Sequence, residues 1–183
     1  MSFAIYLYLL TKIMQELLFM NLFTRKNKEK NYRPDYRFTR VTDITPYDME
    51  RMGAKAVALD LDNTVVPYGS LRYEDGVLQW ADEMRENGYQ VVIISNTIWS
   101  RAFIMSRKLG NAPFFGFALK PWTLGLRVIS KAINVPVSEI AMVGDKYTTD
   151  ILSANNGGAI SVKVTALSEL KAEAGIPAVA AAK

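Results

Sequence analysis

Two short acidic motifs in this chain have the residue types and the spacing of a phosphate-handling site. The first is Asp60-Leu61-Asp62-Asn63-Thr64, and the second, at residues 144–150, contains Asp145 and Asp150. Carboxylates held close together raise one another's pKa unless a cation or hydrogen-bond donors compensate. Mg²⁺ does so with hard oxygen ligands, usually one or two carboxylates, water and phosphate oxygens. The motifs therefore predict magnesium-dependent phosphoryl transfer, with Asp60, Asp62, Asp145 and Asp150 as candidate metal ligands.

The amino-acid composition excludes several classes of catalytic site. The chain has no His and no Cys, which excludes phospho-His and phospho-Cys nucleophiles, Ser-His-Asp and Cys-His hydrolases, and ordinary zinc sites. A carboxylate, a hydroxyl or a metal-bound water must therefore act as the nucleophile.

The elements that position the motifs are apolar runs of strand length. Residues 54–61 and 140–143 are nearly continuous in Val, Ala, Leu and Ile, a pattern typical of strands buried on both faces of a parallel sheet. Each acidic motif follows the carboxyl end of one such strand, where open α/β sheets bind ligands. We therefore expect the two motifs to meet at one edge of the sheet.

Strands and helices alternate along the chain. Further strands are predicted at residues 89–94, 114–118 and 159–164, with intervening helices at 74–87, 100–109 and 123–133. This order predicts an α/β fold, a Rossmann-like three-layer sandwich of about five parallel strands with helices on both faces. The intervals 65–73 and 110–119 are too short to hold an inserted cap domain, so we expect an open site.

The chain of 183 residues, half of them apolar, is long enough for one α/β core with extensions. The basic residues are unevenly placed: residues 25–40 have a net charge of +5, and the rest of the chain has −1. The predicted organisation is an apolar amphipathic segment at 1–24, a basic linker at 25–41, the catalytic domain at 42–165 and an Ala-rich tail at 166–183.

The first 24 residues bear on whether the protein contacts a membrane. Lys12, Gln15 and Glu16 form a polar helical face, which disfavours a membrane span and leaves an interfacial helix or a loose anchor. The alternative is that translation starts at Met14 or Met20. A basic segment after the apolar stretch would keep the domain cytoplasmic, with peripheral contact at the inner face of an anionic membrane.

The motifs together resemble those of the haloacid dehalogenase (HAD) superfamily, subfamily IIIA. The matching elements, in order, are Asp60-Leu61-Asp62-Asn63-Thr64, Ser95, Lys120, and Gly144-Asp145 with Thr149-Asp150. The resemblance covers about residues 42–165. It is nearest to the YqeG-type phosphatases, which are similar to mitochondrial and plastid phosphatidylglycerophosphate phosphatases.

This resemblance implies a role for each motif residue. Asp60 would attack phosphorus to form an aspartyl-phosphate, and Asp62 would protonate the leaving alkoxide and then activate water. Ser95 would donate a hydrogen bond to a phosphoryl oxygen, and Lys120 would offset charge on both the nucleophile Asp60 and the transferred group. Asp145 would hold Mg²⁺ directly.

The remaining site residues have supporting roles in the resemblance. Asp150 would orient Lys120 or a metal-bound water, and the backbone carbonyl of Asp62 would complete the metal ligands. The residues expected to shape the phosphate loop are Asn63, Thr64, Asn96 and Gly144.

The implied substrate is a phosphorylated lipid headgroup, phosphatidylglycerophosphate, which an open site could reach at a membrane surface. Trp99 and Trp122, which follow the second and third motifs, are candidates for the rim of the site. Nucleic acid is an unlikely partner because the basic segment offers no evident stacking platform.

The motifs are also compatible with two other functions. One is a phosphatase of a soluble phosphosugar or of a nucleic-acid 3′-phosphate. The other is a non-hydrolytic, magnesium-binding phospho-acceptor of the receiver type. Motif order disfavours the second, because receivers place the acceptor Asp on a later strand than the acidic pair.

Overall fold

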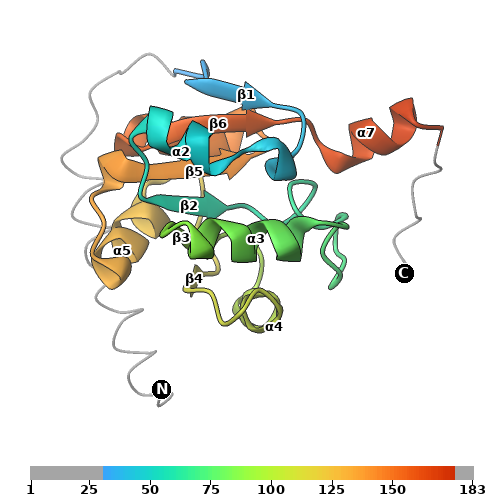
Figure 1. The fold of residues 1–183 in the computed structure, drawn as a ribbon, viewed down its shortest axis with the longest axis horizontal. Coiled ribbons are helices and arrows are strands. Elements are labelled where there is room, and N and C mark those ends of the chain that lie inside the picture. The colour runs from blue at the N-terminus through green and yellow to red at the C-terminus, as the bar shows by residue number, and fades with distance from the viewer. Residues whose placement is uncertain (1–30, 176–183) are drawn as a thin grey trace. The chain divides into compact units, whose positions relative to one another are not determined.

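A parallel sheet forms the centre of the fold. The computed structural model describes residues 31–175, so the predicted segment at 1–24 and the last eight residues lie outside the described residues. The sheet has six strands in the order β1-β6-β5-β2-β3-β4, and every neighbouring pair is parallel. The predicted α/β fold with helices on both faces is confirmed (Figure 1).

The strands and helices occupy the following ranges. The strands are β1 (Tyr36–Phe38), β2 (Ala56–Leu59), β3 (Gln90–Ile94), β4 (Phe114–Phe115), β5 (Ile140–Gly144) and β6 (Ile160–Val164). The α-helices are α2 (Pro46–Met52), α3 (Val77–Glu86), α4 (Trp99–Lys108), α5 (Leu124–Ile133), α6 (Leu152–Gly157) and α7 (Leu167–Glu173). Short helical turns are η1 (Val41–Asp43), η2 (Val137–Glu139) and the π-helical η3 (Tyr147–Ile151).

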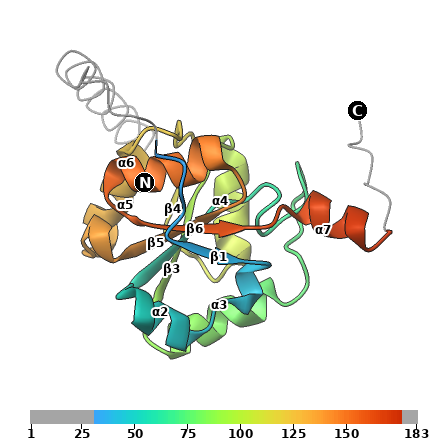
Figure 2. The same cartoon turned by 90° about the horizontal axis from the view of Figure 1, so that it is seen from above.

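Two apolar clusters hold the layers together. Helices α2 and α3 bury Met49, Trp80 and Met84 against one face of the sheet, and α5 and α6 bury Leu126 and Ala154 against the other. The two helix layers are visible on opposite sides of the sheet in Figure 2. Because β2 and β5 lie at the centre with every residue buried, their carboxyl ends are held in a fixed position.

Local sequence signals determine where helix α2, near the start of the domain, begins and ends. Helix α2 begins with a capping box in which the Thr45 hydroxyl accepts from Asp48 N–H at 3.2 Å and the Asp48 carboxylate accepts from Thr45 N–H at 2.9 Å. Hydrogen bonds from Thr45 lower the pKa of Asp48. The helix ends at Gly53, whose φ of 68° suits the left-handed C-terminal position.

The sheet has one strand that the sequence did not predict. Residues 36–38, assigned to the basic linker, form edge strand β1, in which Tyr36 and Phe38 pack on the core and Arg37 faces outward. Three residues are too few to produce a recognisable period. The linker assignment at 25–41 is therefore wrong for this segment.

No inserted domain interrupts the sheet within residues 31–175, since the connection from β2 to α3 and that from α4 to β4 are loops. Strand β4 is shorter than predicted because the backbone leaves the extended conformation at Phe117 and Leu119, which have φ of 50° and 51°. Among the residues described, no helix is long and apolar enough to cross a membrane.

Candidate active site

Three carboxylates converge at the carboxyl edge of the sheet. Asp60 follows β2, and its N–H donates to the carbonyl of Val143 in the neighbouring β5 at 3.0 Å. Asp145 follows β5, and Asp150 comes from η3. One oxygen from each of Asp60, Asp145 and Asp150 lies within 4.8 Å of the others. The two acidic motifs therefore meet, as the parallel strands predict.

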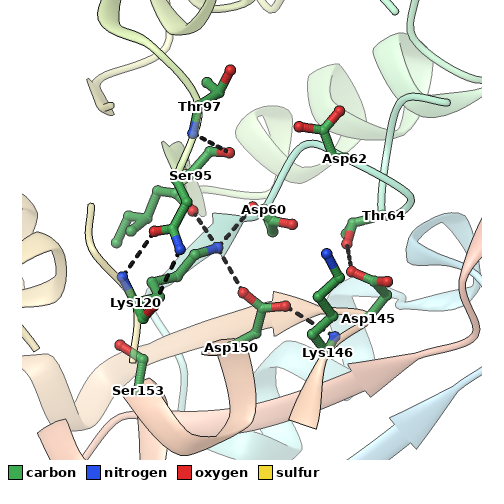
Figure 3. A network of polar contacts seen from close by, with 12 residues as sticks. Asp60, Asp62, Thr64, Ser95, Thr97, Lys120, Asp145, Lys146, Asp150 and Ser153 are labelled. Atoms are coloured by element: carbon green, nitrogen blue, oxygen red, sulfur yellow. Dashed lines mark hydrogen bonds and ion pairs between the residues drawn. The ribbon is translucent and has the colours of Figure 1, made fainter. Parts of the chain in front are cut away.

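Lys120 lies between two of these carboxylates (Figure 3). Its Nζ is 2.7 Å from Asp60 Oδ1 and 2.6 Å from Asp150 Oδ1, and it also donates to the carbonyl of Ile94 at 2.9 Å. The residue is only 6% exposed. A buried ammonium needs such partners, because an unpaired charge in the interior is strongly unfavourable.

Asn96 fixes the backbone that carries Lys120. Its side-chain oxygen accepts from Lys120 N–H at 2.8 Å, and its amide donates to the Lys120 carbonyl at 3.1 Å. This side chain was predicted to shape the phosphate loop, and in the structure its hydrogen bonds are to the backbone of Lys120. Its effect on phosphate would therefore act through the position of Lys120.

The cluster carries uncompensated negative charge. Burial raises the pKa of Asp60 to about 6, with Asp150 adding to the effect and Lys120 opposing it. Burial and the charge of Asp150 also raise the pKa of Asp145. Burial alone would lower the pKa of Lys120, but Asp150 and Asp60 outweigh it and hold that pKa above its usual value. Lys120 therefore stays charged, and one ammonium faces three carboxylates.

The donor set fits a divalent cation. Three carboxylates with one ammonium leave a charge of −2 when all are ionised, and the raised pKa values of Asp60 and Asp145 show that this charge is poorly tolerated. The ligand atoms are hard oxygens, which Mg²⁺ prefers. Asp60, Asp145 and Asp150 could therefore hold such an ion.

Asp62 was predicted to contribute its carboxylate to the metal cluster, and the structure contradicts this. Its two oxygens accept from Arg101 Nη1 and Nη2 at 2.8 Å each, and one also accepts from Gly69 N–H at 2.8 Å. A bidentate guanidinium pair of this kind fixes a carboxylate firmly. Three acidic side chains therefore converge rather than four. The role of the Asp62 backbone carbonyl as a metal ligand stays a prediction.

Arg101 is the site residue that the sequence did not reveal. It lies in the first turn of α4, half-buried, and also donates to Thr97 Oγ1 at 3.0 Å and to the Ser70 carbonyl at 2.8 Å. A cation is unfavourable near a helix N-terminus. That mismatch was the available signal that Arg101 has a carboxylate partner.

The remaining predicted residues lie around the cluster. Ser95 follows β3, is 2% exposed, and its Oγ accepts a 3.4 Å bond from Thr97 N–H. Thr64 Oγ1 donates to Asp145 Oδ1 at 3.3 Å. Asn63 has a φ of 59° and turns the chain after Asp62, with its N–H on the Val66 carbonyl at 2.8 Å.

Gly144 leaves the space that Asp150 occupies. A Cβ on Gly144 would lie 2.3 Å from Asp150 Cγ and 2.4 Å from its Oδ2, far inside van der Waals contact. The same carboxylate accepts from Lys146 N–H at 3.0 Å, and Asp150 is fully buried. A glycine is therefore required for Asp150 to reach Lys120.

We expect Gly144→Ala to displace Asp150 and loosen the Lys120 ion pair. Overpacking of this kind costs about 1–3 kcal/mol of unfolding free energy, measurable by urea denaturation. Gly157→Ala is the matched control, because its nearest contact is the flexible end of Leu126 at 3.0 Å. Equal stability of Gly144→Ala and the native protein would contradict the packing argument.

Comparison with known proteins finds similarity to HAD-type hydrolases. Residues 118–178 match the family model described as "HAD-hyrolase-like". The chain is also 29% identical over 130 residues to "Probable phosphatase YqeG" of Bacillus subtilis (strain 168), covering 71% of this chain and 75% of that protein. Both matches are to proteins of the HAD type, so the chain is similar to the HAD superfamily. The YqeG-type resemblance predicted from the motifs is thereby confirmed.

Solved structures give distant matches to this chain. An uncharacterized protein from Listeria monocytogenes serotype 4b is 16% identical with a TM-score of 0.49, covering 66% of this chain and 96% of that one. The hypothetical protein XCC2798 from Xanthomonas campestris is 17% identical with a TM-score of 0.49, covering 69% of this chain and 72% of that one.

Proposed function

We propose that this protein is a magnesium-dependent phosphomonoesterase of the HAD type that converts phosphatidylglycerophosphate to phosphatidylglycerol and phosphate through an aspartyl-phosphate on Asp60. The observation that carries the proposal is the Lys120 ammonium bridging Asp60 and Asp150 within the three-carboxylate cluster. The similarity to a protein described as a probable phosphatase supports the reaction class.

Asp60 is suited to act as the nucleophile. In the first step an Asp60 oxygen forms a bond to phosphorus while the bond from phosphorus to the ester oxygen breaks, and Asp62 gives a proton to the leaving alkoxide. In the second step a water oxygen bonds to phosphorus, the Asp60–phosphorus bond breaks, and Asp62 takes the proton of the water. Phosphate leaves and Asp60 is regenerated.

Other side chains would stabilise the charge that develops on the phosphoryl oxygens. Lys120 lies beside Asp60 Oδ1, and the Ser95 hydroxyl, whose Oγ accepts from Thr97 N–H, would donate to a phosphoryl oxygen. Mg²⁺ held by Asp60, Asp145, Asp150 and the Asp62 carbonyl would add positive charge there when bound. Asp62 must exchange one of its bonds to Arg101 for a bond to the leaving oxygen.

The lipid substrate is supported by the surface beside the site. Four large apolar side chains on the two loops carrying Ser95 and Lys120 are exposed: Ile98 by 55%, Phe117 by 51%, Leu119 by 45% and Trp122 by 47%. We call them the apolar rim. The loops are joined where Phe117 N–H donates to the Thr97 carbonyl at 2.8 Å.

Two residues of the apolar rim combine two energetically unfavourable features. Phe117 and Leu119 expose apolar side chains and also adopt positive φ, which is uncommon for bulky residues. Strain of this kind tends to persist where it has a function. Contact with a bilayer would bury these side chains and bring the site to a headgroup at the cytoplasmic face of the membrane.

A substrate panel tests the proposal. Phosphate release should be fastest from phosphatidylglycerophosphate in mixed micelles, and slower from a soluble phosphosugar or from an oligonucleotide with a 3′-phosphate. Release from a soluble substrate at a higher kcat/KM would remove the lipid assignment while keeping the phosphatase. Absence of release from every member of the panel would instead favour the phospho-acceptor alternative.

Magnesium should stabilise the protein more at pH 7.5 than at pH 5. Burial raises the pKa of Asp60 from the ordinary aspartate value of 3.8 to about 6, so between these values the folded state binds more protons and stability without metal falls as pH rises. Below pH 6 the proton competes with the cation. At roughly 100 times Kd, the cation adds about 2.7 kcal/mol, which raises Tm by about 5–10 °C. Equal Tm shifts at both pH values would contradict this.

The rim should contribute to membrane binding. In flotation with vesicles containing anionic phosphatidylglycerol, Phe117→Ser with Trp122→Ser should reduce recovery of the full chain several-fold, because the exposed apolar area is lost. Tyr47→Ser is the control, since Tyr47 is 65% exposed but lies in α2. Unchanged recovery of the double variant would exclude the rim as the contact surface.

A further inference from the structure

Two basic residues lie in the same row of the sheet as the catalytic carboxylate. Gly144 of β5 is the register partner of Lys163 in β6, and Lys163 is the partner of Arg37 in β1. Alternation along the strands places Asp60, Gly144, Lys163 and Arg37 on one face, because Ala58 and Met142 pack in the cluster under α5 while Val162 and Val164 pack on the other side.

Both cations contact Tyr147. Arg37 Nη1 donates to the Tyr147 hydroxyl at 2.5 Å, and Arg37 Cζ and Lys163 Nζ lie 5.5 Å and 5.2 Å from its ring centroid. Tyr147 belongs to η3, the same turn that supplies Asp150. The basic pair is thus joined through one short element to the candidate active site.

The pair borders a pocket without acidic residues. This pocket of 330 Å³ is lined by Arg37, Phe38, Thr39, Lys163, Val164 and Thr165. Within residues 31–175 neither Arg37 nor Lys163 forms an ion pair with a carboxylate. Two like charges on one ring, beside a polar pocket, form a site that an anion would neutralise.

We propose that Arg37 and Lys163, with Tyr147, bind a second phosphate of the substrate, the phosphodiester that joins the headgroup to its lipid. The inference rests on the proposed function, because it assigns the part of the substrate that does not react. Two strand spacings, about 10 Å, separate the Asp60 and Lys163 strands. The proposal requires the Lys163 and Arg37 side chains to extend towards Asp60 when substrate binds, so that one glycerol between two phosphates bridges the gap.

Such a site would select substrates by charge as well as by apolar contact. A monoester that lacks a second phosphate would occupy Asp60 and Lys120 but leave the basic pair unused. The pair should therefore lower KM for the bisphosphorylated headgroup and leave kcat unchanged, since it does not touch the reacting atoms.

The test uses the full chain and two soluble probes. Glycerophosphoglycerophosphate carries the diester and the monoester without acyl chains, and glycerol 3-phosphate carries the monoester alone. In Arg37→Gln with Lys163→Gln, KM for the first should rise about 10-fold or more, with kcat unchanged and kinetics on glycerol 3-phosphate unaltered. Equal KM changes for both probes, or none, would overturn the second site.

Arg51→Gln is the matched control. Arg51 lies 5.8 Å from the Tyr47 ring, in the same kind of cation–π contact, on α2 at the other face of the sheet. We expect this variant to have native kinetics with both probes. A loss equal to that of the double variant would show that net charge, rather than the basic pair, determines binding.

Binding of a diester without a monoester separates this inference from the proposed reaction. By calorimetry, glycerophosphoglycerol should bind the native protein and bind the double variant at least about 10-fold more weakly, whether or not any substrate is hydrolysed. Equal binding to both would reject the basic pair even if phosphatase activity is found. If inorganic phosphate loses as much affinity as the diester, the site is one for free phosphate and the diester assignment fails.

Discussion

Asp60→Asn should reduce phosphate release by about 10³-fold or more, because the variant lacks the oxygen that bonds to phosphorus. The amide is nearly the same size as the carboxylate, so the fold should persist. Without divalent cation its Tm should equal or exceed that of the native protein. The raised pKa of Asp60, about 6, indicates that the folded protein disfavours its charge.

Asp82→Asn provides the matched control. Asp82 is exposed on α3, where it pairs with Arg85 at 2.7 Å, and exposed pairs contribute little to stability. Its variant should have native turnover and native Tm. Native turnover in Asp60→Asn would eliminate the covalent mechanism, and loss of the folded circular dichroism spectrum would invalidate the activity comparison.

Lys120→Met should remove both activity and stability. The change leaves Asp60 and Asp150 as buried carboxylates without their shared ammonium, and breaking a buried ion pair in this way costs about 3–5 kcal/mol. Turnover should fall by about 10³-fold because the attacking oxygen and the phosphoryl oxygens lose the same charge. Urea denaturation and phosphate release measure the two effects separately.

Lys55→Met and a double variant control for these effects. Lys55 is 69% exposed and 2.8 Å from Glu139, so its loss should cost less than about 1 kcal/mol. Lys120→Met with Asp150→Asn should recover part of the lost stability but none of the lost activity. A Lys120→Met variant no less stable than Lys55→Met would contradict the buried bridge.

The sequence was sufficient where burial leaves a simple pattern. The central strands β2 and β5 are buried on both faces, so their apolar runs predicted both the strands and the meeting of Asp60 with Asp145. The edge strand β1 gave no such pattern, because it has three residues and Arg37 alternates with two partly buried aromatics. Edge pairing depends on a distant partner, β6, that local sequence does not reveal.

Side-chain partnerships were the least predictable part of the site. The motifs placed Asp62 and Lys120 near the cluster and implied a contact between Lys120 and Asp150, but they did not indicate a partner for Asp62. In the structure Lys120 forms ion pairs with Asp60 and Asp150, and Arg101 from α4 forms an ion pair with Asp62. Which charged side chains pair depends on the relative orientation of a helix and a loop that are not adjacent in the sequence.

A phosphoryl group bound to Asp60 can be trapped and located chemically. The protein is mixed with Mg²⁺ and the best substrate of the panel, quenched in acid during turnover and reduced with borohydride, which converts an aspartyl-phosphate to homoserine. Mass spectrometry should find homoserine at position 60 and no such change in Asp60→Asn. Turnover without modification, or homoserine at another aspartate, would contradict the proposed nucleophile.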